Sequence, residues 1–341
     1  MGQPRVDNRT EFAVHPQLLL DLDGEKLAVI VKASFEARRG KRELDLAPPH
    51  RTRGVRMADI PWGDPEKSSI AYPADLFLRK PGTDVIVVAK GYAPKETTSF
   101  DVRVVVGPVQ KTLRLHGPRV WLDDGTVGAA GPLKELELRY EHAYGGFDDS
   151  DADKPVEEPR NPVGSGLVAP GSSLAGSAAP QIEDPKAPIG GIGVVPKPVG
   201  IGVVGRSWEP RRRYAGTHDD SWREQLAPLP PRDFDDRFNV CAAEGMWSAT
   251  PLSGGETIEL SNLLPDESAK TLELPRVALE IAFRRPGEEP HTQRPHLDTV
   301  IVDLLETGPD KPPAVEMVWR ASIPAPRRVA DCTVVVREVR A

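Results

Sequence analysis

Several carboxylates and aromatic side chains are crowded into one short run near the middle of the chain. The run Trp208–Asn239 holds these side chains at close spacing: Asp219, Asp220, Asp233, Asp235 and Asp236, with Trp208, Trp222 and Phe234. Paired carboxylates beside an aromatic platform can hydrolyse a glycosidic bond, one as the acid and the other as the base or nucleophile. The run therefore admits a carbohydrate-active hydrolase that uses Asp219, Asp233 and Asp235. Exposed tryptophans would suit a non-catalytic glycan-binding module instead.

The same carboxylates have structural uses. An Asp in a segment rich in proline and glycine most often caps a helix or closes a turn. We expect Asp219 or Asp220 to cap a short helix over Asp220–Leu226, and Asp233 to close the turn that follows Pro230. These roles are favoured over catalysis.

Other motifs of catalysis and ligand binding are incomplete. Ser165 lies between glycines, but the spacing is not that of a nucleophile elbow. The glycine-rich runs 190–193 and 200–205 are not followed by the Lys and Ser or Thr of a phosphate loop. His291 and His296 lack further ligands in matched spacing. The sequence therefore predicts no enzyme, no cofactor and no metal.

The composition predicts a globular β protein. Hydrophobic residues make up 39% of the chain, and its 36 prolines disfavour helix interiors and central strands. A net charge of −7 argues against nucleic-acid binding, which usually shows a basic surface. Cys241 and Cys332 form no disulfide framework, and no apolar run has the length of a signal peptide or a membrane span. We expect a cytoplasmic protein without a membrane partner.

The first part of the chain, 1–147, reads as strands. The expected strands are Lys26–Phe35, Thr83–Tyr92, Phe100–Gly107, Gln110–His116 and Lys134–Tyr140. The third and fourth flank a short Gly-Pro turn, which predicts a hairpin.

The middle part, 148–240, is rich in proline and glycine. Its apolar side chains are more numerous than a flexible linker needs: Leu167, Ile182, Ile189, Ile192, Val194, Val195, Val199, Ile201 and Val203. We favour an ordered meander that wraps over the β body. A flexible linker is the alternative.

The last part, 241–341, reads as strands again: Thr257–Leu260, Val277–Phe283, Thr299–Leu304, Val315–Arg320 and Thr333–Val339. Strand-rich ends around an irregular middle predict one composite antiparallel body, sandwich-like or barrel-like, with a long ordered insertion and few short helices. Trp121 and Trp319 are expected in the core. Trp62 and Trp247 are expected at the surface.

Separated blocks of the chain resemble the bacterial family DUF2169. The blocks are Val31-Lys-Ala-Ser-Phe35, Lys80-Pro-Gly-Thr-Asp-Val85, Arg139-Tyr-Glu-His-Ala-Tyr-Gly-Gly146, Asn161-Pro-Val-Gly-Ser-Gly166 and the run Trp208–Asn239. The resemblance covers roughly residues 15 to 320. It implies an adaptor or chaperone of type VI secretion, which binds a toxic effector and helps to load it onto the spike and tip proteins.

The run after Asn239 departs from this resemblance. The family often has an Ala-Pro-Pro-Asp-Gln-like run there, whereas this chain has Val240-Cys-Ala-Ala-Glu-Gly-Met246. If that run contacts the effector, the choice of partner differs in this chain.

The candidate partner-binding residues lie in two of these blocks, Arg139–Gly146 and Trp208–Asn239, which are together called the central signature here. They are Tyr140, Glu141, Gly145, Gly146, Trp208, Arg211, Asp219, Trp222, Asp233 and Phe234. We expect an ion pair between Arg211 and Asp233 or Asp235. The alternative is that these side chains fix the meander to the β body.

Overall fold

The fold is described by a computed structural model that covers residues 2–150, 153–168, 175–190, 196–308 and 310–340. Ile192, Val194 and Val195 of the predicted meander lie outside these residues. The chain is mainly β, as predicted, with several mostly antiparallel sheets. None of the sheets built from the described residues closes into a barrel.

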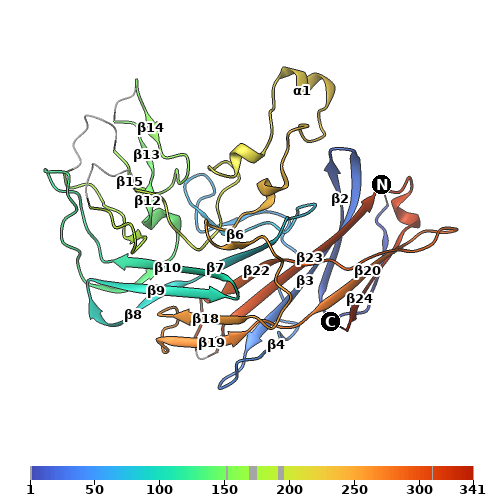
Figure 1. Ribbon diagram of the computed structural model, residues 1–341, viewed down its shortest axis with the longest axis horizontal. Coiled ribbons are helices and arrows are strands. Elements are labelled where there is room, and N and C mark those ends of the chain that lie inside the picture. The colour runs from blue at the N-terminus through green and yellow to red at the C-terminus, as the bar shows by residue number, and fades with distance from the viewer. Residues whose placement is uncertain (1, 151–152, 169–174, 191–195, 309, 341) are drawn as a thin grey trace.

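The central sheet joins strands from both ends of the chain (Figure 1). Its order is β17 (Trp247–Ser248), β7 (Thr83–Val88), β22 (Leu297–Asp303), β23 (Ala314–Pro324), β3 (Gly24–Ala37) and β2 (Ala13–Asp21), with β4 (Leu44–Leu46) also pairing β3. Every residue of β7 and β22 is buried. Strands with such unbroken burial have both faces covered.

Two further sheets pack against the central one. The first has the order β16 (Ile182–Glu183), β10 (Val109–His116), β9 (Ser99–Val106), β18 (Thr257–Ser261) and β19 (Ala269–Glu273). The second has the order β1 (Arg5–Asn8), β24 (Thr333–Val339), β20 (Ala278–Arg284) and β21 (His291–Gln293). Val31, Val104 and Phe283, one from each sheet, belong to a single apolar core. The body is therefore sandwich-like.

Short elements complete the fold. The two-stranded sheets are β11 (Leu133–Glu137) with β8 (Lys90–Thr97), β12 (Tyr144–Gly145) with β15 (Ser165–Gly166), β13 (Phe147–Asp148) with β14 (Val156–Glu157), and β5 (Ile60–Pro61) with β6 (Ile70–Tyr72). Among the described residues the helices are α1 (Asp220–Gln225) and four short 3-10 helices, η1 (Tyr140–His142), η2 (Arg212–Tyr214), η3 (Asp236–Asn239) and η4 (Val329–Asp331). The short helix predicted at Asp220–Leu226 is confirmed.

One predicted strand is in fact two. The prediction of a single strand over Thr83–Tyr92 is wrong, because the chain changes sheets after Val88. The carbonyl of Val88 accepts from the backbone N–H of Leu304, and that of Ala89 accepts from Leu138. Consecutive carbonyls thus pair with different neighbours, so one apolar run serves both β7 and β8.

The described parts of 148–240 are ordered by their apolar side chains. Ile182, Ile201 and Val203 are buried in the main core. Ile189 belongs to a smaller core that Leu167 covers in part. Trp121 and Trp319 are buried, as predicted. The expectation of exposed Trp62 and Trp247 is wrong, because both are half-buried against the main core.

Candidate functional site

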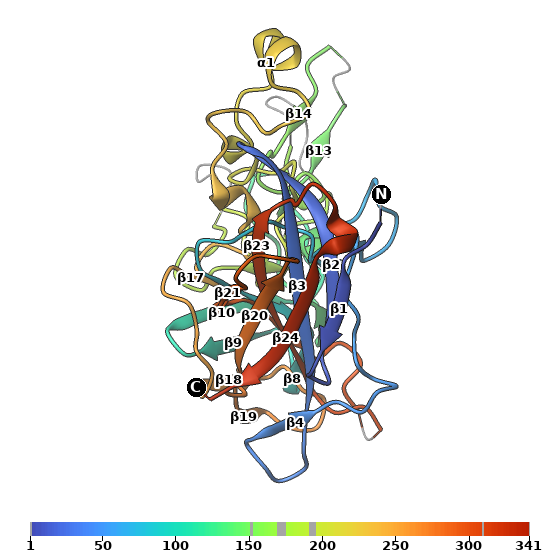
Figure 2. The ribbon, with the colours of Figure 1, turned by 90° about the vertical axis from the view of Figure 1, so that its right-hand side faces the viewer.

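Residues 206–240, called the arm here, leave the β body and return to it. Figures 1 and 2 both show α1 at the far end of this segment, well away from the three large sheets. The helix has no buried residue. The arm thus carries most of the central signature out from the body.

Arg211 closes the base of the arm. Its side chain is buried, and Nη1 donates to the carbonyl of Val204 at 2.5 Å while Nε donates to the carbonyl of Phe238 at 3.0 Å. One guanidinium thereby joins the outgoing and the returning segments of the arm, called its two legs here. The predicted ion pair of Arg211 with Asp233 or Asp235 is wrong, because burial places the guanidinium among backbone carbonyls.

The tip of the arm is held by side-chain oxygens. Asp219 caps α1, accepting from the backbone N–H of Trp222 at 2.8 Å, as predicted. Asp233 does not close its own turn, since the backbone N–H of Phe234 does that. The Asp233 carboxylate instead accepts from the N–H and the hydroxyl of Thr217, at 2.9 and 2.7 Å. It joins the two legs a second time.

Three of the predicted site residues share a shallow hollow. Asp219, Trp222 and Asp233 line a space of about 200 Å³, and Asp235 is not among the residues that line it. Hydrogen bonds from the backbone and hydroxyl of Thr217 lower the pKa of Asp233. A glycosidase acid needs a raised pKa, so this carboxylate suits a base or a binding group better.

Tyr140 and Trp208 lock the signature to the body. Both side chains are buried, and their rings meet edge to face at 5.3 Å between centroids. A Cβ on Gly200 would lie 2.8 Å from Tyr140, and one on Gly205 would lie 2.9 Å from Trp208. The small residues are needed for this packing, so the two aromatics have a structural role.

The blocks Arg139–Gly146 and Asn161–Gly166 pack together as one unit, called the glycine unit here. Asn161 is fully buried, and its Nδ2 donates to the carbonyls of Tyr140 and Tyr144, both at 2.9 Å. Gly145 has φ +148°, and a Cβ there would overlap the backbone of Asn161. Gly146 follows with φ +116° and donates its N–H to the Asn161 carbonyl.

Glu141 fastens this unit to a second loop. Its carboxylate accepts from the N–H of Ser69 at 2.9 Å and from the Ser69 hydroxyl at 2.6 Å. Glu141 is thus engaged inside the protein rather than offered to a partner.

A groove of about 180 Å³ lies between the arm and the β2–β3 hairpin. It is lined by apolar side chains (Leu19, Leu20, Leu76, Phe77, Leu78, Pro230, Phe234 and Phe238) and by the polar side chains of Asp21, Arg206, Asp236 and Asn239. Phe234 packs edge to face on Phe238 at 5.8 Å. This groove is therefore where the signature segment meets the edge strand β2 of the central sheet.

Buried charges support the base of the arm. Lys80 donates to Asp84 at 2.6 Å and to Thr299 at 3.0 Å, and all three side chains are almost fully buried. Asp84 also accepts from the backbone N–H of Cys241, just after the arm. Burial raises the pKa of the Cys241 thiol to about 12, so it stays protonated at neutral pH.

A second buried cluster lies on the central sheet. Lys32 contacts Asp75 and Glu316, both at 2.8 Å, and Arg56 reaches Glu316 at 2.5 and 2.6 Å. Burial alone would raise the pKa of Glu316, but Lys32 and Arg56 outweigh it and hold that pKa at about 2. The cluster is fully paired and fixes the loop that carries Asp75.

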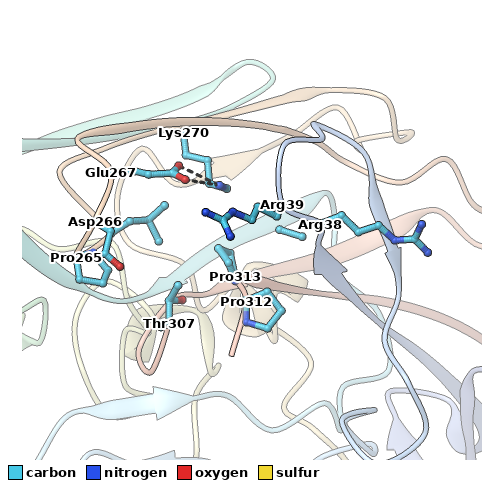
Figure 3. A pocket seen from close by; sticks show the side chains of 12 residues that line it. Arg38, Arg39, Pro265, Asp266, Glu267, Lys270, Thr307, Pro312 and Pro313 are labelled. Atoms are coloured by element: carbon cyan, nitrogen blue, oxygen red, sulfur yellow. Dashed lines mark hydrogen bonds and ion pairs between the residues drawn. The ribbon is translucent and has the colours of Figure 1, made fainter. Parts of the chain in front are cut away.

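A further hollow, of about 390 Å³, lies away from the arm beside the end of β3 (Figure 3). Arg39 and Lys270 are among its lining residues, and Lys270 is paired with Glu267 at 2.9 Å. None of the predicted site residues lines it.

The described part of the chain lacks two further features. No three His, Cys, Asp or Glu side chains there are grouped as metal ligands. No helix there is long and apolar enough to cross a membrane.

The sequence did not mark the buried residues that hold the candidate site in place. Asn161, Lys80 and Asp84 were not among the candidates, although each stands in a block that carries the resemblance. A buried Asn or Lys has no local pattern to mark it. Their occurrence inside those blocks was the available signal.

Comparison with known proteins gives a family and no individual relative. No curated protein and no solved structure matches the chain significantly. Residues 23–320 match a family described as an uncharacterized protein conserved in bacteria. This span includes the buried clusters, the glycine unit and the whole arm, so the chain belongs to the DUF2169 family.

Proposed function

We propose that this protein is a non-catalytic adaptor or chaperone that binds a type VI secretion effector and helps to load it onto the spike and tip proteins. The resemblance of the signature blocks implies that role. The groove between the arm and the β2–β3 hairpin is the observation that supports it.

The groove is preformed on both sides. Arg211 and Asp233 each join the two legs of the arm. A surface that is already ordered loses little conformational entropy when a partner binds. The arm therefore suits recognition of a protein segment.

Apolar side chains continue from the groove onto the hairpin tip. Leu20 and Leu22 are 39% and 43% exposed, and Leu20 also lines the groove. Strand β2 is the outer strand of its sheet, and an extended partner segment can pair with such an edge. Leu20 and Leu22 are the contacts that we assign to the effector.

The test is co-elution of the purified protein with an effector encoded beside it and with the spike and tip proteins. The double substitution Leu20→Asp with Leu22→Asp is expected to abolish co-elution. The matched control is Val120→Asp with Leu122→Asp, which are 42% and 43% exposed and lie outside the groove. The proposal fails if the unaltered protein binds none of these proteins.

A carbohydrate-active hydrolase or glycan-binding module is the second candidate, because Asp219, Trp222 and Asp233 share one hollow. A glycan array and a hydrolysis screen test it. Binding or hydrolysis that Trp222→Ala and Asp233→Asn abolish would favour this candidate over the adaptor.

A further inference from the structure

A separate hollow lies at the base of the arm, on the side of residues 240–247. It has a volume of about 260 Å³, and most of its walls are apolar: Val204, Pro210, Tyr214, Val240, Ala242 and Trp247. Pockets for cofactors and drug-sized ligands usually start near 300 Å³. This space is therefore suited to a group about as large as one amino-acid residue.

A buried cation lines this apolar hollow. Arg211 is 3% exposed, and its Nε and Nη1 are taken by the two carbonyls described above. Its Nη2 is buried and has no hydrogen-bond partner among the described residues. No carboxylate in the described part of the chain is within ion-pair distance of Arg211. A buried guanidinium without an anion is costly, because its charge has lost water and gained no counter-charge.

A second guanidinium stands at the rim. Arg237 also lines the hollow, and it stacks over the ring of Tyr214 at 4.3 Å. Its Nε and Nη2 bind Asp235, at 3.0 and 2.6 Å, which fixes its orientation. Glu244 is the carboxylate among the lining residues, and it disfavours any ligand with a second negative charge.

We propose that this hollow binds the C-terminal carboxylate of a partner polypeptide whose last side chain is apolar. The carboxylate would accept from Arg211 and Arg237, and the last side chain would fill the apolar space. An Asp or Glu within a chain would bring a peptide group on each side against the apolar walls, where neither finds a hydrogen-bond partner. The site stands on its own geometry and does not depend on the adaptor role.

Matched small ligands test the proposal directly. N-acetyl-leucine, N-acetyl-leucinamide and N-acetyl-aspartic acid α-amide are titrated in turn, with binding followed by saturation-transfer NMR. A charge-assisted hydrogen bond gives N-acetyl-leucine an advantage of about tenfold or more over its amide. Equal binding of the acid and the amide, or no binding of either, overturns the proposal. Equal or tighter binding of the aspartate derivative overturns the choice of a chain terminus.

Variants locate the binding. Arg237→Met removes an exposed cation without opening the base of the arm, and is expected to weaken N-acetyl-leucine by about fivefold or more. Arg212→Met removes an exposed neighbouring cation that does not line the hollow and should leave affinity unchanged. Glu244→Gln is expected to tighten binding about twofold. Unchanged affinity in both Arg237→Met and Glu244→Gln would contradict the site.

Discussion

Arg79 joins the β2–β3 hairpin to the arm. Its Nη1 and Nη2 donate to the carboxylate of Asp21 at 2.8 and 3.1 Å, and its Nε donates to Asp236 at 2.6 Å. Hydrogen bonds from Arg79 lower the pKa of Asp21. The two sides of the groove are thus held by one forked side chain.

Substitution of Arg79 is expected to increase local opening at the groove while changing the global stability little. The Arg79 side chain is 45% exposed, so Arg79→Met should cost less than about 1 kcal/mol of global stability. Hydrogen exchange should quicken at Leu22 and around Asp236. Arg9→Met, which breaks a surface pair with Asp7, is the control and should leave both regions unchanged. Equal exchange in the two variants would refute the coupling.

Loss of Lys32 is expected to destabilise the whole fold. Lys32→Met would leave Asp75 and Glu316 buried with one cation fewer, at a cost of about 3–5 kcal/mol. Urea unfolding measures this change in the free energy of unfolding. Lys90→Met breaks a surface pair with Glu135 and should cost less than about 1 kcal/mol. A comparable cost for the two would show that the buried cluster contributes no more than a surface pair.

Acid should weaken the fold through Glu316. Its pKa is about 2 in the folded protein and 4.5 ordinarily. A folded-state pKa below the unfolded one gives stability that is complete above pH 4.5 and lost as the pH falls toward 2. Urea unfolding between pH 5 and 2 measures the slope. Glu316→Gln, if folded, should show a shallower slope, and an identical slope would exclude Glu316 as a source.

Removal of the helix cap should act locally. Asp219→Ala is expected to cost α1 about 1 kcal/mol, because the N–H of Trp222 loses its acceptor. Since α1 has no buried residue, global stability should not change. Trypsin cleavage after Arg223 should accelerate about fivefold. Ser221→Ala, in the same turn, is the control. A global loss of stability would mean that the tip supports the body.

Replacement of Asn161 should unlock the glycine unit. Asn161→Ala leaves the carbonyls of Tyr140 and Tyr144 without their donor, at a cost of about 2–4 kcal/mol. Thermal unfolding measures the loss. Gln110→Ala, at an exposed amide, should change stability by less than about 0.5 kcal/mol. If both variants unfold at the same temperature as the unaltered protein, Asn161 is not a structural link.

The sequence predicted strands whose own pattern is strong. The hairpin of β9 and β10 was predicted from the short Gly-Pro turn between its strands, and the structure confirms the pairing. Strands β3 and β22 were predicted from their apolar runs. Strand β2 was missed because Pro16 interrupts a run without alternation, a feature that an edge strand tolerates.

The candidate site was predicted only in part. Asp219 was placed correctly, because a helix cap is a local signal. Arg211 was not, because its partners are backbone carbonyls, which any residue supplies. Tyr140 and Trp208 lie far apart in the chain, so their contact depends on how the meander folds back.

The pairing of β3 with β23 sets the order in which the nascent chain can fold. Strand β3 ends at residue 37, and its neighbour β23 begins at residue 314. A ribosome must therefore synthesise the chain from β3 through β23 before the middle of the central sheet can close. Until then the apolar surface of β3 stays open to aggregation or to general folding factors, and the arm is made before the sheet that supports it is complete.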